Sequence, residues 1–293
     1  MSRRGWPLFV AMSVIWGLPY LLIRVAVRHM DPGVLVFCRT LPAGLLLAPL
    51  VLARGQVRAI VDNLWWIVTF GVVEFGVPWY LMSTSERHLT SSLTSLIICA
   101  VPLFSLVAQR FRRTEEHVTK RRLAGLGVGA VGVAMLVGLS VRGGSLTWIG
   151  FMLLVCVGYS LGPLILAAKL QHVPGVAVVV GATLAVALLW SPWALTHWPR
   201  SATAETWASA GALSVVCTAG AFLVFFELVK EVGATRSVVV TYLNTAIAVV
   251  LGIVFLREPL TAAILIGFPL VLVGSVLATT PGAPQRSVDL ELA

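Results

Sequence analysis

Apolar stretches of membrane-spanning length fill almost the whole of this chain. A helix that crosses a bilayer needs about 20 mostly apolar residues. Ten such segments follow one another with short connectors, at 5–27, 33–53, 64–83, 90–109, 123–140, 147–168, 174–195, 209–229, 234–255 and 261–279. We therefore predict an all-α integral membrane protein with ten transmembrane helices.

The composition agrees with a chain that lipid surrounds. Apolar residues make up 58% of it, charged residues only 11%, and the mean hydropathy is +0.96, whereas a soluble domain has about 25% charged residues. The net charge of +9 does not indicate nucleic acid, because the basic residues fall in short connectors. The cysteines lie in apolar runs without metal-ligand spacing. We expect no metal site, no disulfide framework and no cofactor.

The basic residues predict the orientation in the membrane. With the N-terminus inside, fourteen Lys and Arg face the cytoplasm and five face outward, as loops rich in these residues require. Six of the fourteen crowd the connector between the fourth and fifth segments, Arg110, Arg112, Arg113, Lys120, Arg121 and Arg122. We expect both termini on the cytoplasmic side of the cell (inner/plasma) membrane, with 281–293 as a disordered tail.

The two halves of the chain resemble each other. An offset of 143 residues aligns the fourth segment with the ninth and places Glu115 on Glu258. Each half has five segments, an odd number, so duplicated halves must insert in opposite orientations. We predict two inverted five-helix repeats, 1–143 and 144–280. Inverted repeats are typical of secondary transporters.

The chain resembles a known family at several motifs. The Trp16-Gly17 pair in the first segment and Arg39 in the second are similar to the drug/metabolite transporter superfamily, in particular its EamA-type ten-helix members. The second-half signature is matched at Tyr242-Leu243-Asn244-Thr245-Ala246, Gly252, Leu256, Glu258-Pro259-Leu260-Thr261, Gly267 and Gly274. A looser version runs from Pro102 through Glu115 to Gly132. The resemblance implies export of small metabolites across a bacterial inner membrane, through a central cavity lined by segments 1, 3, 4, 6, 8 and 9.

The chain departs from that family at two positions. Thr245 stands where proline is common, and Arg257 stands where glycine usually precedes the glutamate. The sequence therefore leaves open whether the second-half helix is broken near Thr245, as proline would break it.

Glu74 is the sharpest candidate for function. It lies about ten residues into the third segment, roughly 15 Å from its inner edge at 1.5 Å per residue. A charge at that depth costs on the order of 2.5–3.5 kcal/mol, and protonation avoids this cost, so the carboxyl is a natural proton carrier. The alternatives are a neutral packing residue or an ion pair with Arg24 or Arg39.

Other polar and aromatic residues inside the segments complete the candidates. Aromatic rings can stack on substrate rings or hold cations, and buried polar groups need partners. The substrate-binding or proton-coupling candidates are Glu74, Trp16, Tyr20, Trp79, Tyr159, Tyr242 and Asn244. The structural or gating candidates are Arg24, Arg39, Pro102 and Glu227, the last as an i,i+3 ion pair with Lys230.

Together these patterns favour a secondary transporter that exports small metabolites such as amino acids or amines. Its partners are a small-molecule substrate, the lipid bilayer and protons, although a passive facilitator also fits, and the chain can act as a monomer or homodimer. A flippase of lipid-linked substrates is the alternative. A membrane enzyme is disfavoured, because an HExxH motif is absent and the five histidines are scattered in connectors.

Overall fold

The computed structural model describes residues 4–111, 120–140, 145–233, 237 and 240–279. In these residues every regular element is a helix. The α-helices are α1 (Gly5–Ala26), α2 (Pro32–Ala53), α3 (Val57–Asp62), α4 (Leu64–Gly71), α5 (Val77–Ser85), α6 (Ser91–Ile98), α7 (Val101–Phe111), α8 (Lys120–Ser140), α9 (Ser145–Ile165), α10 (Gly175–Thr196), α11 (Ala204–Ser214), α12 (Ala221–Val232), α14 (Val240–Leu256) and α15 (Ala262–Thr279). Three π-helical segments, Val72–Gly76, Leu166–Leu170 and Val215–Gly220, continue α4, α9 and α11.

Seven helical stretches in the described residues are long and apolar enough to cross a membrane. They are Gly5–Ala26, Pro32–Ala53, Leu64–Ser85, Ser91–Ala108, Ser145–Leu170, Gly175–Thr196 and Ala204–Val232. Three of the ten predicted segments contain shorter apolar helices, Leu123–Met135, Val240–Leu256 and Ile264–Gly274. Ten membrane-spanning helices therefore stay a prediction, whereas the all-helical, multi-pass architecture is confirmed.

Some sequence expectations fall outside the described residues. These are the acid Glu115, the tail 281–293, and Arg112 and Arg113 of the basic connector.

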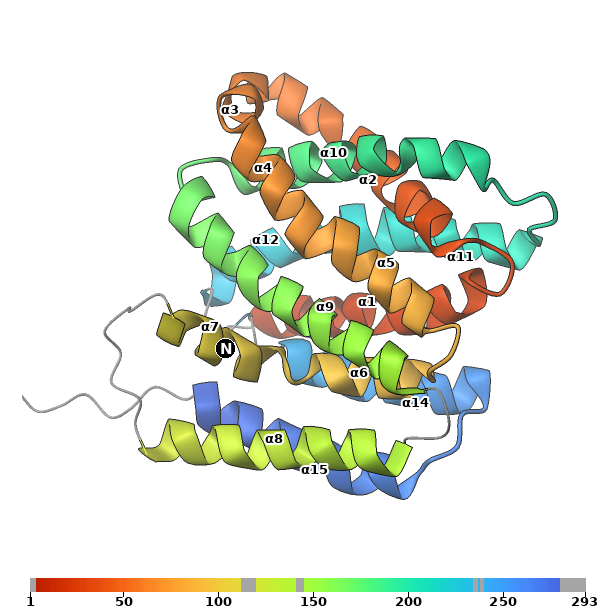
Figure 1. Cartoon of the computed structure of the whole chain (residues 1–293). Helices are drawn as coiled ribbons and strands as arrows, with labels where there is room; N and C mark the ends of the chain where they lie inside the picture. The colour runs from red at the N-terminus through yellow and green to blue at the C-terminus, as the bar shows by residue number, and fades with distance from the viewer. Residues whose placement is uncertain (1–3, 112–119, 141–144, 234–236, 238–239, 280–293) are drawn as a thin grey trace, which may run out of the picture.

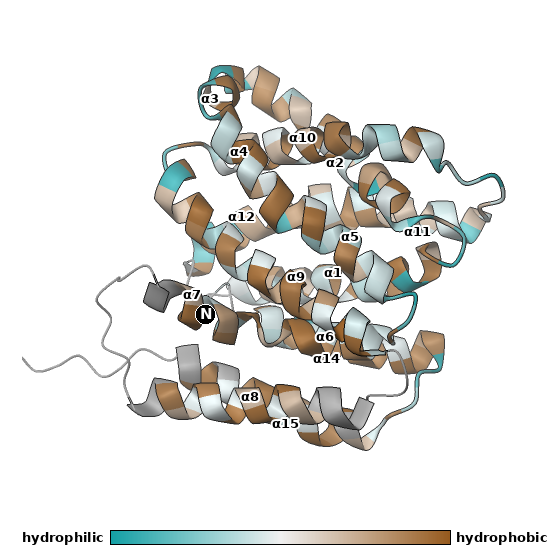
Figure 2. Cartoon of the chain, in the orientation of Figure 1, coloured by the Kyte–Doolittle hydropathy of each residue, from teal (hydrophilic) through white to brown (hydrophobic). Residues whose placement is uncertain are grey.

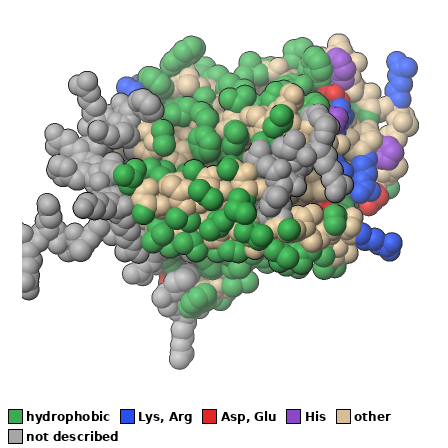
Figure 3. Space-filling view, turned by 60° about the horizontal axis from the view of Figure 1, so that its bottom comes forward, with side chains coloured by type: hydrophobic (Ala, Val, Ile, Leu, Met, Phe, Trp, Pro, Cys, Tyr) green, Lys and Arg blue, Asp and Glu red, His purple; other side chains and the backbone are tan. Residues whose placement is uncertain are grey.

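The helices run back and forth between two ends of the bundle. The connectors 27–31, 86–90, 197–203 and 257–261 lie at the right-hand end in Figure 1, which we call the 86–92 end. The opposite end contains the close of the α9 span and is called the Lys169 end. Hydrophilic residues concentrate in the connectors, while apolar residues follow the helices (Figure 2). In Figure 3, side chains of Lys, Arg, His, Asp and Glu gather at the 86–92 end, and apolar side chains cover the middle.

Glycines allow α8 and α15 to pack closely along one side of the bundle (Figure 1). A Cβ on Gly274 would overlap the backbone of Gly129, and one on Gly132 would lie 2.6 Å from the amide nitrogen of Val271. The helix backbones therefore approach each other only because these positions lack side chains, as small residues permit in membranes.

The fourth predicted segment is broken, whereas the ninth is continuous over the part that α14 describes, Val240–Leu256. Helix α6 ends at Ile98 and α7 begins at Val101, so Pro102 occupies the second position of a new helix, where its missing N–H costs no hydrogen bond. Helix α14 instead runs unbroken through Thr245, whose hydroxyl donates to the carbonyl of Thr241 at 3.0 Å. Threonine keeps the backbone N–H that proline lacks, so the second-half helix does not break here.

Helix α14 ends at a strained residue. Arg257 has a φ of 54°, in the left-handed region that costs a non-glycine residue about 1–2 kcal/mol. This conformation turns the chain back, so that the amide of Glu258 donates to the carbonyl of Gly252 at 3.1 Å. The turn also directs the Glu258 side chain into the bundle, where it is 9% exposed.

We expect Arg257→Gly to stabilise the protein by roughly 0.5–1 kcal/mol. The substitution relieves the left-handed strain, and the greater freedom of glycine in the unfolded chain offsets part of the gain. The measurement is the thermal unfolding midpoint of the purified protein in detergent. Arg257→Ala is the control, because it removes the exposed charge but retains a Cβ. An equal rise for both variants would show that the charge, not the backbone, is responsible.

Candidate functional site

Two π-helical segments lie in the middle of the bundle. In Val72–Gly76, which carries Glu74, the following amide of Val77 donates to the carbonyl of Val72, five residues earlier. Pro78 has no N–H to offer the carbonyl of Glu74 four residues before it, so a regular α-helix cannot continue there. The second segment, Val215–Gly220, begins 143 residues after the first. Single π-turns in helices are frequent at functional sites.

Glu74 faces helix α9. A Cβ on Gly162 would collide with the Glu74 carboxylate, and a Cβ on Gly158 would lie 2.7 Å from the carbonyl oxygen of Val73. The two glycines are four residues apart and therefore present one face of α9. The Oε2 atom of Glu74 is buried and has no hydrogen-bond partner among the described residues. The carboxyl is thus held against a bare stretch of helix with capacity to bind a proton or a ligand.

Arg39 of α2 joins the two π-helical regions. Its guanidinium carbon lies 3.5 Å from the centroid of the Trp79 ring, and its Nε donates to the hydroxyl of Thr218 at 3.0 Å. That hydroxyl donates in turn to the carbonyl of Leu213 at 2.8 Å. Arg39 is only 6% exposed, so its charge is stabilised mainly by an aromatic face and one hydroxyl. Among the described residues, Arg39 and Glu74 form no ion pair.

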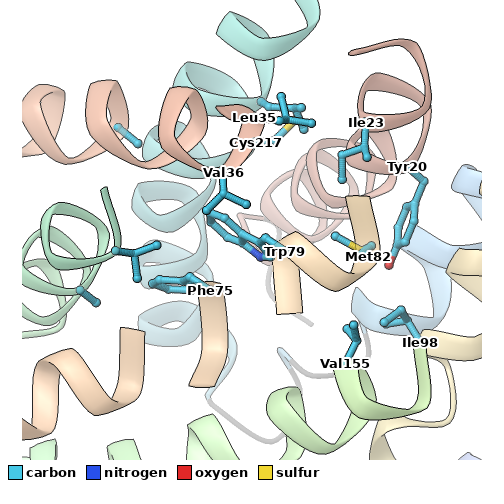
Figure 4. Close-up of a cluster of buried hydrophobic side chains, with 14 of the residues drawn as sticks. Tyr20, Ile23, Leu35, Val36, Phe75, Trp79, Met82, Ile98, Val155 and Cys217 are labelled. Carbon is cyan, nitrogen blue, oxygen red and sulfur yellow. The ribbon is translucent and has the colours of Figure 1, made fainter. Parts of the chain in front are cut away.

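Aromatic rings surround this arginine. Trp79 and Phe75 project from one span toward α2 and α11–α12 (Figure 4); their ring centroids lie 4.8 Å apart, and Phe75 meets Phe222 edge-on at 5.7 Å. Tyr159 of α9 is close enough to Arg39 and Glu74 to interact electrostatically with both. We call the group Arg39, Glu74, Trp79, Tyr159 and Thr218 the central cluster.

The structure brings four predicted site residues into this cluster and places others elsewhere. Tyr20 is buried close to it, beside Met82 (Figure 4). Trp16 packs against Phe225 with the two rings tilted and their centroids 5.0 Å apart, in a separate apolar cluster. Asn244 is buried where α14 crosses Gly17.

The remaining candidates have clear structural partners. Tyr242 packs against the main apolar core. Pro102 lies at the start of α7. The exposed Glu227 carboxylate accepts from Lys230 at 2.6 Å, which is the predicted i,i+3 ion pair.

A second polar group holds the 86–92 connector at its end of the bundle. Arg24 of α1 donates to the backbone carbonyl of Glu86, and Arg87 donates to the carbonyl of Met30 at 2.9 Å. The His88 ring stacks on Trp148 at the start of α9, 3.8 Å between centroids. The connector is therefore fastened to three other parts of the chain.

Glu258 fastens the same connector from the second half of the chain. Its carboxylate accepts from the backbone amides of Ser91 and Ser92 at 2.7 and 3.0 Å, and from the Ser92 hydroxyl at 2.6 Å. Two free amides and the helix dipole make the start of α6 an anion site, and Glu258 fills it. A Cβ on Gly252 would lie 2.6 Å from this carboxylate, so glycine is needed there.

Sequence analysis missed the roles of Glu86, Glu258 and Thr218. Glu86 is fully buried, and neither carboxylate oxygen has a partner among the described residues. Its place directly after an apolar segment and before Arg87 made it look like an ordinary connector charge. For Glu258, the sequence does contain a signal. The Thr90-Ser91-Ser92 run is typical of a helix N-terminus that accepts an anion.

Comparison with known proteins gives relatives named as transporters. The chain is 28% identical over 183 residues to the "Probable amino-acid metabolite efflux pump" of Salmonella typhimurium, a match to 61% of this chain and 58% of that protein. It therefore spans less than two thirds of that pump. It is 26% identical over 292 residues to the "Uncharacterized transporter YvbV" of Bacillus subtilis, covering 97% of this chain and 94% of that one.

Two further comparisons concern the membrane and the fold. The "Uncharacterized inner membrane transporter YedA" of Escherichia coli K12 is 24% identical over 264 residues, covering 85% of this chain and 83% of that one. A solved crystal structure with 17% identity superposes with a TM-score of 0.67 over 95% of this chain and 97% of that chain. This likeness shows a shared fold.

The family match covers nearly the whole chain. The model described as "EamA-like transporter family" matches residues 3–138 and again residues 146–280. The chain is therefore a membrane transporter that belongs to the EamA-like transporter family.

Proposed function

We propose that this protein exports small metabolites, of the amino-acid or amine class, across the cytoplasmic membrane by alternating access. Its two five-helix halves lie in opposite orientations, with both termini in the cytoplasm, and a proton taken up by Glu74 drives the export. The name of the Salmonella relative, an amino-acid metabolite efflux pump, supports the substrate class and the direction. The positive-inside distribution of Lys and Arg supports the orientation.

Three observations support the duplication. The family model matches once in each half. The π-helical segments Val72–Gly76 and Val215–Gly220 begin 143 residues apart, which is the offset that aligns the fourth and ninth segments in the sequence. The fifth helices of the two halves, α8 and α15, pack against each other.

The central cluster is the observation that carries the proposal, because it lies where the two halves meet. Glu74 from the first half packs on Gly162 from the second, and Arg39 from the first half donates to Thr218 from the second. When one half rocks against the other, these are the contacts that must change. A substrate or proton bound there gains or loses interactions with the movement, as coupling requires.

We infer that this conformation is closed at the 86–92 end, which faces outward in the proposed orientation. Arg24, Arg87 and Glu258 tie the connector across the mouth of the bundle. Opening outward therefore requires Glu258 to leave the start of α6. The carboxylate then loses charge-assisted hydrogen bonds, each worth about 1.5–3 kcal/mol, so substrate or proton binding must compensate.

We expect Glu74→Gln to reduce export driven by a pH gradient to the level of membranes without the protein. The amide is close in shape to the carboxyl but cannot carry a proton. The first measurement is untargeted mass spectrometry of the medium from cells that overproduce either protein. The metabolite found there is then tested in proteoliposomes with and without an imposed pH gradient.

The matched control is Glu227→Gln, which removes an exposed carboxylate already paired with Lys230. It should export like the unaltered protein. If the metabolite is enriched equally outside cells with Glu74→Gln and cells with the unaltered protein, Glu74 has no role in the mechanism, while export still stands. If cells with the unaltered protein and cells with Glu74→Gln both fail to enrich any metabolite outside, although both proteins reach the membrane, the export hypothesis is wrong. Movement of a lipid-linked substrate then becomes the better hypothesis.

We expect Glu258→Gln to favour the state that is open at the 86–92 end. The neutral amide oxygen is a weaker acceptor for the two amides of α6 than the carboxylate. The four native cysteines are replaced, and Ser95→Cys, at a fully buried position in α6, serves as the probe. A membrane-impermeant maleimide added outside intact cells should label it roughly tenfold faster, as a loss of about 1.4 kcal/mol predicts.

Glu205→Gln provides the comparison, because Glu205 is an exposed carboxylate at the same end, in the first turn of α11. This variant should leave the labelling rate unchanged. If Glu258→Gln also leaves it unchanged, the contact with α6 does not control access to the bundle.

A further inference from the structure

An elongated groove runs along the surface of the bundle between α4, α7 and α9. Its volume is about 540 Å³. The lining residues are Trp66, Phe104, Val107, Ala108, Val157, Ser160, Leu161, Leu164, Ile165, Ala168 and Lys169. The Ser160 hydroxyl is already engaged, because it donates to the carbonyl of Val157 at 2.7 Å. The groove therefore offers apolar walls and one charged group, Lys169.

The groove is about as long as one lipid leaflet is thick. Val157 and Lys169 are twelve residues apart on one helical stretch, roughly 18 Å at 1.5 Å per residue, and half of a hydrocarbon core is about 15 Å thick. Gly158, next to Val157, packs against Val73 and Pro78 in the middle of the Leu64–Ser85 span. The groove thus extends from mid-membrane to the interface at the Lys169 end.

No described carboxylate neutralises the charge at the mouth of the groove. The Lys169 ammonium lies 4.8 Å from the centroid of the Trp66 ring, an aromatic residue of the kind that marks the membrane interface. Among the described residues it has no carboxylate partner. Lys230, at the same end of the bundle, is by contrast paired with Glu227 at 2.6 Å.

A second groove shows what the charge adds. It lies between the α3–α4 region and α10 and has a volume of about 380 Å³. Its lining is wholly apolar, namely Ile60, Leu64, Val68, Gly181, Leu184, Ala185, Leu188 and Leu189. Any lipid chain can rest there, but no lining group selects a headgroup.

We propose that the groove with Lys169 at its mouth binds an anionic phospholipid from the leaflet at that end, the cytoplasmic leaflet in the orientation proposed above. One acyl chain fills the apolar length, and the headgroup phosphate binds the Lys169 ammonium. Opposite charge at a membrane interface favours such lipids over zwitterionic ones. The site is distinct from the central cluster and does not depend on which metabolite is carried.

The bound lipid has a direct path to the transport machinery. Helix α9 carries the groove residues Val157 and Leu161 and, on the adjacent face, Gly158 and Gly162 that pack against the π-helical segment carrying Glu74. A chain in the groove supports α9 from the lipid side and so holds the surface against which Glu74 rests. Membrane composition thereby affects the position of α9.

The experiment uses phosphatidylglycerol and phosphatidylethanolamine with the same diazirine-bearing acyl chain, each mixed into liposomes that contain the full-length protein. After irradiation, peptide mass spectrometry locates and quantifies the cross-links. We expect phosphatidylglycerol to label residues 157–168 and 104–108 several-fold more than phosphatidylethanolamine. The second groove, around Leu188 and Leu189, should be labelled equally by both lipids.

Variants separate the charge from the cavity. Lys169→Gln should lower phosphatidylglycerol labelling in the groove to the phosphatidylethanolamine level, Lys169→Arg should retain the preference, and Lys230→Gln should not alter it. Ala168→Trp should fill the mouth of the groove and reduce labelling by both lipids. Size-exclusion profiles and unfolding midpoints confirm that each variant is folded.

Two results would overturn the proposal. One is equal labelling of the groove by the two lipids in the unaltered protein. The other is a preference for phosphatidylglycerol that survives Lys169→Gln, since the selecting charge would then lie elsewhere in the chain.

Discussion

The buried guanidinium of Arg39 is the interaction around which the interior is organised. A charge in a low-dielectric interior is expensive unless other groups stabilise it, and this one is held by the Trp79 ring and the Thr218 hydroxyl. Trp79 lies three residues after the end of one π-helical segment, and Thr218 lies within the other. Movement of either segment therefore removes one of the groups that stabilise the guanidinium charge. The arginine therefore links the span that carries Trp79 to the span that carries Thr218.

The low dielectric of the interior also explains the polar contacts at the 86–92 end. The first amides of any helix have no partner within that helix, and inside a membrane each must find one elsewhere. Helix α6 follows the 86–90 connector, and its start presents the amides of Ser91 and Ser92 to the interior. Glu258, brought inward by the left-handed turn at Arg257, satisfies two of them. The strain at one residue thus allows a satisfied helix terminus on another segment.

How far the sequence predicts this structure depends on the range of the interactions. The apolar lengths predicted the all-helical fold. Position within a span selected Glu74, Trp79 and Tyr159, and the family resemblance selected Arg39; the structure brings these four residues close together. The first three were found because a polar or aromatic group inside a span is unusual on its own. Trp16 was selected by the same rule, but it packs on Phe225, because depth alone does not say which face of a helix a residue occupies.

Contacts between distant segments escaped the local patterns. Ser91 and Glu258 are separated by 167 residues, and Arg39 and Thr218 by 179. A threonine in an apolar helix usually bonds its own backbone, and Thr218 does so as well as accepting from Arg39. No periodicity distinguishes such a threonine from its neighbours, so its partner is visible only once the helices are packed.

On the proposed duplication, the two π-helical segments have the same backbone form but different chemistry. The offset of 143 residues places Glu74 on Cys217, Phe75 on Thr218 and Trp79 on Phe222. One half thus retains an ionisable carboxyl, while the other offers a thiol and the hydroxyl that binds Arg39. A pair of carboxyls at these two positions would repel each other when both were ionised. A single one can exchange its proton without that penalty, which is consistent with one coupling site shared by two similar halves.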